Sequence, residues 1–264
     1  MRASFQIPSA PWLSRGLLAA GLLAASATAS AALNTFTFNP AAAGLAGTTF
    51  SADNLLVSDY ATVTLTSPTT FTNTGFLVVT GAQLNNSTLS IPGLNSSYGL
   101  YFAFSGQGTL DGNNPLTQVS VGSFTSLTYT LYGYNGTATF GFTGTTPTTT
   151  AASPVALASG TLVSGSTVSI PGGGAFSSSA SAIVTLGSIS AAFMSPAAFY
   201  NQAQTSFSNT SSQVQFFDGG FMLQQGGGSI NFATAVPEPM TSALLLGGLG
   251  VIGFVARRRG TRAR

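Results

Sequence analysis

The sequence predicts an all-β domain, an antiparallel sandwich or jelly roll, between residues 32 and 232. Short runs of β-branched and aromatic residues alternate with Thr or Ser, so each predicted strand has one apolar and one hydroxylated face. Clusters of Gly, Asn, Pro and Ser separate these runs at spacings typical of sandwiches. The clearest strands are 61–66, 127–132 and 182–186, and further candidates are 33–38, 76–80, 100–105, 137–142, 167–170, 214–217, 221–224 and 230–232. Two low-complexity segments are expected outside strands, 143–153 as a long exposed loop and 224–228 as the connection of the last hairpin.

One segment of this domain departs from the strand pattern. Ser195 followed by Pro196 is the capping pair of a helix start, because Ser accepts from free backbone N–H groups and Pro fits the first helical position. Phe199, Ala203 and Phe207 then recur at four-residue intervals. We therefore expect one short helix here, packed on a sheet.

The N-terminus, residues 1–31, has the pattern of a secretory signal peptide. Arg2 and Arg15 form a basic region, and a short apolar core follows them. Ala29 and Ala31 then supply the small-residue site that signal peptidase cleaves. The mature chain is therefore expected to begin after residue 31.

The C-terminus carries a second apolar run, at 240–256, followed by the basic cluster Arg257, Arg258 and Arg259. A helix of this length reaches roughly 26 Å, which spans a bilayer with local thinning or tilted flanks. Basic residues next to a span mark its cytoplasmic end. The sequence thus predicts a transmembrane helix whose preceding residues lie across the inner membrane.

A short motif precedes that run: Val236-Pro237-Glu238-Pro239. The two prolines hold the backbone extended and present Glu238 on a stiff, non-helical segment. Together with the apolar helix and the arginine cluster, the motif resembles the PEP-CTERM sorting signal of Gram-negative bacteria. The resemblance implies that residues 233–264 are a linker plus a sorting signal, that an exosortase in the inner membrane recognises the motif, and that the tail is removed.

The charge distribution separates the two ends from the domain between them. All seven arginines lie in the first fifteen or the last eight residues, and lysine, histidine and cysteine are absent. A domain without cationic side chains cannot neutralise phosphates, so nucleic acid is excluded as a partner.

Without disulfides, stability must come from burial in one sizeable core. The only acids between residues 32 and 235 are Asp53, Asp59, Asp111 and Asp218, which give a net charge of −4.

Few side chains are available for catalysis. The absence of His, Cys and Lys removes the Ser-His-Asp and Cys-His arrangements, Schiff-base lysines, and histidine or thiolate metal sites. We therefore expect no catalytic, cofactor or metal site and a protein that is not an enzyme. The remaining alternative is an envelope glycan hydrolase that uses a pair of the four aspartates.

The composition favours association instead. A surface with so few charges offers little repulsion between copies, and Thr, Ser, Asn and Gln can hydrogen-bond to uncharged polymers. Exposed aromatic rings can stack on sugars. Exopolysaccharide, or another copy of the chain, is thus the expected partner. The ordinary expectation for the tyrosines is packing, and this applies to Tyr98, Tyr101, Tyr129, Tyr132, Tyr134 and Tyr200.

A second resemblance spans most of the mature chain. It is carried by 38–40, 44–45, 50–54, 59–61, 93–101, 199–201 and 225–232. In these segments the chain is similar to the flocculation-associated PEP-CTERM proteins of floc-forming, exopolysaccharide-producing bacteria. The resemblance implies a secreted or cell-surface matrix protein that promotes flocculation or biofilm formation, and it supplies no catalytic residue.

Overall fold

The computed structural model describes residues 33–172 and 175–234. The fold below belongs to the described part of the unit Asn34–Arg264. The expected signal-peptidase site at Ala29 and Ala31, the sorting motif, the apolar helix and the arginine cluster lie outside the described residues. Within those residues, no helix is both long and apolar enough to cross a bilayer.

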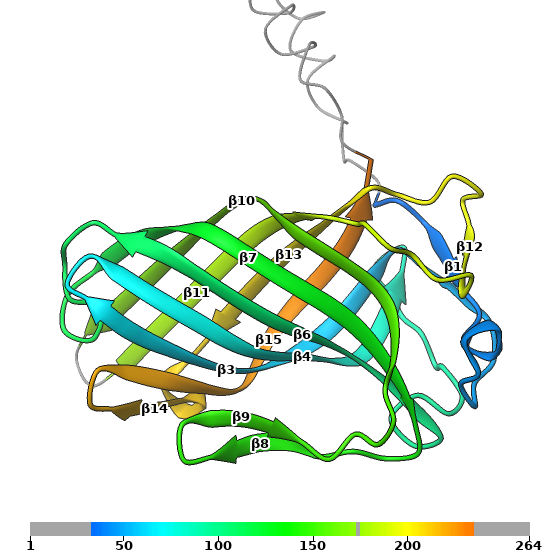
Figure 1. The fold of residues 1–264 in the computed structure, drawn as a ribbon, viewed down its shortest axis with the longest axis horizontal. Coiled ribbons are helices and arrows are strands. Elements are labelled where there is room, and N and C mark those ends of the chain that lie inside the picture. The colour runs from blue at the N-terminus through cyan, green and yellow to red at the C-terminus, as the bar shows by residue number, and fades with distance from the viewer. Residues whose placement is uncertain (1–32, 173–174, 235–264) are drawn as a thin grey trace, which may run out of the picture. The chain divides into compact units, whose positions relative to one another are not determined.

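Eight antiparallel strands form one closed barrel in the order β13-β11-β10-β7-β6-β4-β3-β15 (Figure 1). The sheet closes because β15 pairs with β13 as well as with β3. The all-β prediction is confirmed, but one sheet curled on itself takes the place of the expected two-layer sandwich. The strands are β3 (Asn54–Ser67), β4 (Thr70–Leu84), β6 (Tyr98–Leu110), β7 (Ser120–Asn135), β10 (Val155–Gly172), β11 (Ala175–Thr185), β13 (Gln202–Asn209) and β15 (Gly220–Ala233).

Bulges and inward-facing glycines explain how the sheet curls. Register shifts occur in β3, β7, β10 and β15, and each bulge bends its strand and raises the local twist. Where a large side chain fills the interior, the facing residue is often glycine. A Cβ on Gly108 would collide with Phe71, and a Cβ on Gly228 would collide with Phe207. The predicted connection at 224–228 was wrong, because this glycine-rich stretch continues β15 through a bulge.

A small sheet packs at one end of the barrel (Figure 1). It consists of β1 (Phe36–Phe38), β2 (Phe50–Ala52) and β12 (Phe193–Ser195), with the 3-10 helix η1 (Pro40–Ala43) between β1 and β2. Its aromatic rings meet the last barrel strand, and Phe36 contacts Phe232 edge-on at 4.9 Å between ring centroids. The main core begins with this aromatic layer and continues into the barrel.

The helix expected from Ser195 onward was wrong. Ser195 ends β12, and the chain enters β13 at Gln202. A four-residue interval is also two periods of a strand, so Ala203 and Phe207 face the barrel interior together. The spacing that was interpreted as a helix is therefore equally compatible with the observed strand.

Two hairpins lie beside the barrel wall. The segment expected as a loop at 143–153 instead contributes to the hairpin of β8 (Phe140–Thr143) and β9 (Thr146–Thr149). Gly144, at φ 60°, opens its two-residue turn, as hairpin geometry requires. The second hairpin pairs β14 (Val214–Phe217) with β15. Two short elements complete the described chain, β5 (Ser87–Thr88) and the 3-10 helix η2 (Ser211–Gln213).

Candidate functional site

A groove on the outside of the barrel runs between the two hairpins. It has a volume of about 390 Å³. We call it the outer groove, and it is lined by Tyr60, Phe140, Gly141, Phe142, Gly144, Gln215, Met222, Gln224 and Gln225. The lining contains no Asp, Glu, Lys, Arg or His, and apart from Met222 its side chains are aromatic rings and amides.

An aromatic cluster on the outer face of the barrel anchors the β8–β9 side of the groove. The ring of Phe140 lies 5.3 Å from Tyr101 and 5.7 Å from Phe76, measured between centroids. Tyr60 points outward from β3 and its ring lies 6.1 Å from Phe140. The Thr62 hydroxyl also donates to the carbonyl of Thr145 in the hairpin turn. These contacts fix the hairpin, and with it Phe142, against the barrel.

Glutamine side chains line the opposite side of the groove. Gln224 Nε2 donates to Gln215 Oε1 at 3.0 Å, which joins the facing strands β15 and β14. Gln225 sits in the β15 bulge with φ 60°, and its carbonyl accepts from Gln213 Nε2 at 2.8 Å. The side-chain amides of Gln215 and Gln224 thus hold each other in place, and each retains further donor or acceptor capacity.

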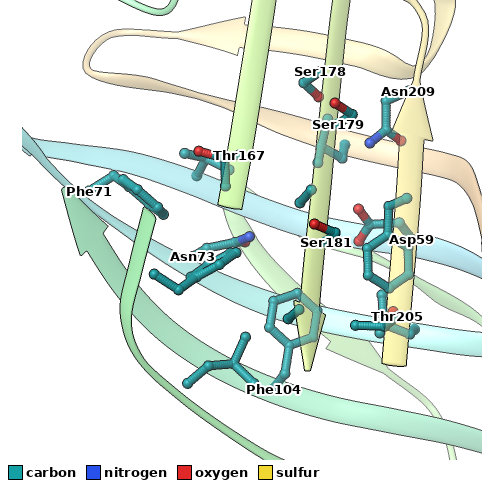
Figure 2. A pocket seen from close by; sticks show the side chains of 18 of the residues that line it. Asp59, Phe71, Asn73, Phe104, Thr167, Ser178, Ser179, Ser181, Thr205 and Asn209 are labelled. Atoms are coloured by element: carbon teal, nitrogen blue, oxygen red, sulfur yellow. The ribbon is translucent and has the colours of Figure 1, made fainter. Parts of the chain in front are cut away.

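Inside the barrel lies a second candidate site, which we call the inner chamber, with a volume of about 90 Å³. Most of its lining is apolar, as expected where eight strands leave space for side chains or one small ligand. Figure 2 shows the polar side chains that interrupt this lining, among them Asp59 from β3, Asn73 from β4 and Asn209 from β13. The chamber therefore combines an apolar wall with a small polar region.

The polar region is a row of residues that are paired with one another on adjacent barrel strands. Ser120 pairs with Ser169, Ser169 with Ser178, and Ser178 with Asn209 on adjacent strands. Residues paired directly across strands face the same side of a sheet, so all four point inward. Asp59 continues this stripe, and the Asn209 side chain hydrogen-bonds to it.

Asp59 is the electrostatic centre of the inner chamber. Only 4% of the residue is exposed, and desolvation raises the pKa of its carboxyl from 3.8 to about 7. The hydrogen bond from Asn209 favours the charged form and partly offsets this rise in pKa. Gly226 makes that bond possible, because a Cβ at this position would lie 1.4 Å from Asn209 Oδ1.

Several buried polar atoms of the inner chamber have no hydrogen-bond partner within the protein. Such atoms are uncommon, because an unsatisfied buried polar group costs about 1–3 kcal/mol. In this chamber they are Asp59 Oδ1, Asn73 Oδ1, Ser178 Oγ, Thr205 Oγ1 and Asn209 Oδ1. Most of them are acceptors, so a guest that donates hydrogen bonds would satisfy them.

The four aspartates considered for a hydrolase do not meet in the chamber. Of the acids in the described residues, Asp59 alone lines it. Asp53 Oδ2 accepts from the backbone N–H of Asn85 at 2.6 Å, and Asp218 lies exposed in the turn between β14 and β15. The described part of the chain also holds no cluster of three potential metal-ligating side chains among His, Cys, Asp and Glu.

Asp111 stays in its own turn on the surface. Slight desolvation raises the pKa of its carboxyl, but hydrogen bonds from Asn113, Val121 and Ser120 lower it. The net effect is a pKa below the ordinary value. The bonds come from residues within ten positions of Asp111 in the chain. They therefore occupy the carboxylate locally and give it the role of a turn residue.

Sequence reasoning identified neither site in advance. The expectation that tyrosines pack is confirmed for Tyr98, Tyr101, Tyr129 and Tyr134, which are buried. Tyr60, which lines the outer groove, was not among the candidates. One signal for the inner chamber was present, because Asp59 occupies an apolar-face position in the alternation of β3 from Leu55 to Leu65.

Comparison with known proteins gives one match. Residues 235–259 match the family model of the PEP-CTERM protein-sorting motif. No curated protein and no solved structure shows significant similarity to the chain.

The match agrees with the resemblance of the 236–259 segment and defines the class of the chain: an exosortase-substrate PEP-CTERM protein. This protein is accordingly one that is exported to the cell surface or the extracellular space.

Proposed function

We propose that this exported protein promotes flocculation or biofilm formation by binding exopolysaccharide in the outer groove. The observation that carries the proposal is the lining of that groove, where Tyr60, Phe140 and Phe142 face a row of glutamine amides without any charged side chain. Aromatic rings stack on the apolar faces of sugars, and amides donate to and accept from hydroxyl groups. The role is one of binding and not of catalysis.

The charge of the domain specifies the kind of polysaccharide. Residues 32–235 carry four aspartates and no basic residue. A polyanionic polymer would be repelled and would find no Lys or Arg to pair with its carboxylates or sulfates. The groove is thus suited to a neutral polysaccharide or to neutral stretches of a mixed one.

Association between copies, the other part of the expected function, would use the outer faces of the barrel. Each of the eight barrel strands is paired on both sides, so these strands leave no free edge for a second copy to extend. The outward-facing Thr and Ser rows are the surfaces that remain, for example Thr128 and Thr161 on β7 and β10, which are exposed.

The groove assignment predicts a specific loss of binding. The double variant Phe142→Ala, Gln224→Ala removes one ring and one amide from the groove without touching the Phe140 anchor. We expect about thirtyfold weaker binding to exopolysaccharide from the producing cells, because a ring contact and a hydrogen bond each contribute about 1 kcal/mol. Isothermal titration or co-sedimentation with the purified polymer measures the change.

A matched control is available on the outer face of β6, outside the groove lining. Gln107 is an exposed glutamine on β6 that does not line the groove, so Gln107→Ala should leave binding unchanged. Equal affinities of the wild type and the double variant for the polymer, with both proteins folded, would show that the outer groove is not the binding site.

A further inference from the structure

We propose that the inner chamber binds a small organic ammonium ion, a primary amine with a short apolar body, whose charged head pairs with Asp59. The proposal concerns the interior of the barrel and is independent of the outer groove and of exopolysaccharide. It starts from the placement of one carboxyl group in an otherwise largely apolar cavity.

The carboxyl group of Asp59 has one oxygen without a hydrogen-bond partner in the protein. Its Oδ1 is buried without a hydrogen bond, and Thr205 Oγ1 and Ser178 Oγ in the same chamber are also unpartnered. A buried carboxylate requires a countercharge or a proton. Because residues 32–235 contain no Lys, Arg or His, a countercharge must come from outside the domain.

The unsatisfied polar atoms of the chamber can all accept hydrogen bonds. Asp59 Oδ1 and Asn73 Oδ1 are acceptors, and the two hydroxyl groups can accept as well. A primary ammonium has three N–H donors, and it can therefore satisfy the carboxylate and two of these oxygens together. An anion would meet further acceptors and is disfavoured.

The remaining wall of the chamber is mostly apolar and encloses a small volume. Leu77, Phe102, Leu127, Val184 and Ile230 line the chamber beyond the polar region. A volume of about 90 Å³ corresponds to about six to nine water-sized spheres, and an apolar cavity of about 150 Å³ accommodates benzene. A guest with three to five carbon or nitrogen atoms therefore fits, with its alkyl part against these side chains.

The ionisation of Asp59 agrees with such a guest. Desolvation raises the pKa of Asp59 to about 7, so a proton takes the place of the countercharge below this pH. A bound ammonium would restore the carboxylate. Tyr129 is the other titratable group of the described chamber lining, and burial raises the pKa of its hydroxyl, so it stays neutral.

The experiment compares n-butylammonium with n-butanol as probes of the full protein recovered from cells. Calorimetric titration at about pH 8 should give at least about tenfold tighter binding of butylammonium, because its hydrogen bonds to a carboxylate are charge-assisted. Between about pH 6 and pH 8 the affinity for butylammonium should rise as Asp59 ionises, whereas the affinity for butanol should not.

The isosteric variant Asp59→Asn provides the control. It should lose the preference for butylammonium and keep a folded barrel, which circular dichroism and a cooperative urea transition would verify. Three outcomes overturn the proposal: no binding of either probe, equal binding of the charged and neutral probes, or an unchanged preference in the variant. The first of these would mean that the chamber holds water alone.

Discussion

Replacing Gly226 by alanine is expected to lower the free energy of unfolding by about 3 kcal/mol or more. The new Cβ would lie 1.4 Å from Asn209 Oδ1 and 2.5 Å from its Cγ, so the asparagine side chain must leave its position. Asn209 is 2% exposed and has little room to move. The change therefore adds overpacking, about 1–3 kcal/mol, to the loss of the hydrogen bond to Asp59, about 1.5–3 kcal/mol when the carboxyl is charged.

Gly227→Ala is the matched control for this prediction. It lies next in the same strand, a Cβ there meets nothing within 4 Å, and its φ is compatible with alanine. Urea denaturation of both variants should place Gly227→Ala within about 0.5 kcal/mol of the wild type. A second substitution, Asn209→Ala, should make Gly226→Ala much less costly, as expected for directly interacting sites. Equal stabilities of the two glycine variants would contradict the packing described for Gly226.

The second large effect is a fall in stability as pH rises through the titration range of Asp59. Burial raises the pKa of this carboxyl from 3.8 to about 7 in the folded protein. Between these two pKa values the folded state holds a proton that the unfolded state has lost, so folding is favoured at the acid end of the window. The free energy of unfolding should fall by about 1.4 kcal/mol per pH unit, and by several kcal/mol in total, before levelling above about pH 7.

Urea denaturation at several pH values between about 4.5 and 8.5 measures this slope. In Asp59→Asn the slope should vanish, and the variant should be more stable than the wild type at about pH 8, because a neutral amide replaces a buried charge. Asp111 does not contribute to the slope of stability against pH, since its lowered pKa places its titration below this pH range. A wild-type stability that rises across the window would falsify the burial assigned to Asp59.

Local patterns predicted the strands well and their assembly poorly. The alternation at 61–66, 127–132 and 182–186 corresponds to parts of β3, β7 and β11. This alternation shows which face of each strand is apolar. The apolar face turns toward the core in a sandwich and in a barrel alike, so the alternation does not distinguish the two folds. Closure depends on the antiparallel pairing of 202–208 with 227–233, which no local pattern encodes.

The two candidate sites illustrate the same limit. Tyr60, Phe140 and Gln224 meet in the outer groove although long stretches of chain separate them, and each is unremarkable in its own segment. The sorting motif at 235–259 is contiguous, so the sequence alone was enough to recognise it. Asp59 was partly predictable from the sequence. An acid among the apolar-face residues of β3 indicates a buried carboxyl group, but it does not indicate which residues surround that group.

The most direct test of the account is flocculation by cells that lack the gene. Polysaccharide production should be unchanged while the flocs disperse, and the wild-type gene should restore them. The Phe142→Ala, Gln224→Ala gene should not, although the intact mass of its surface product should match a chain processed at both ends in the same way as the wild type. Flocs that persist in the deletion strain, or that the groove variant restores fully, would contradict the role proposed for the outer groove.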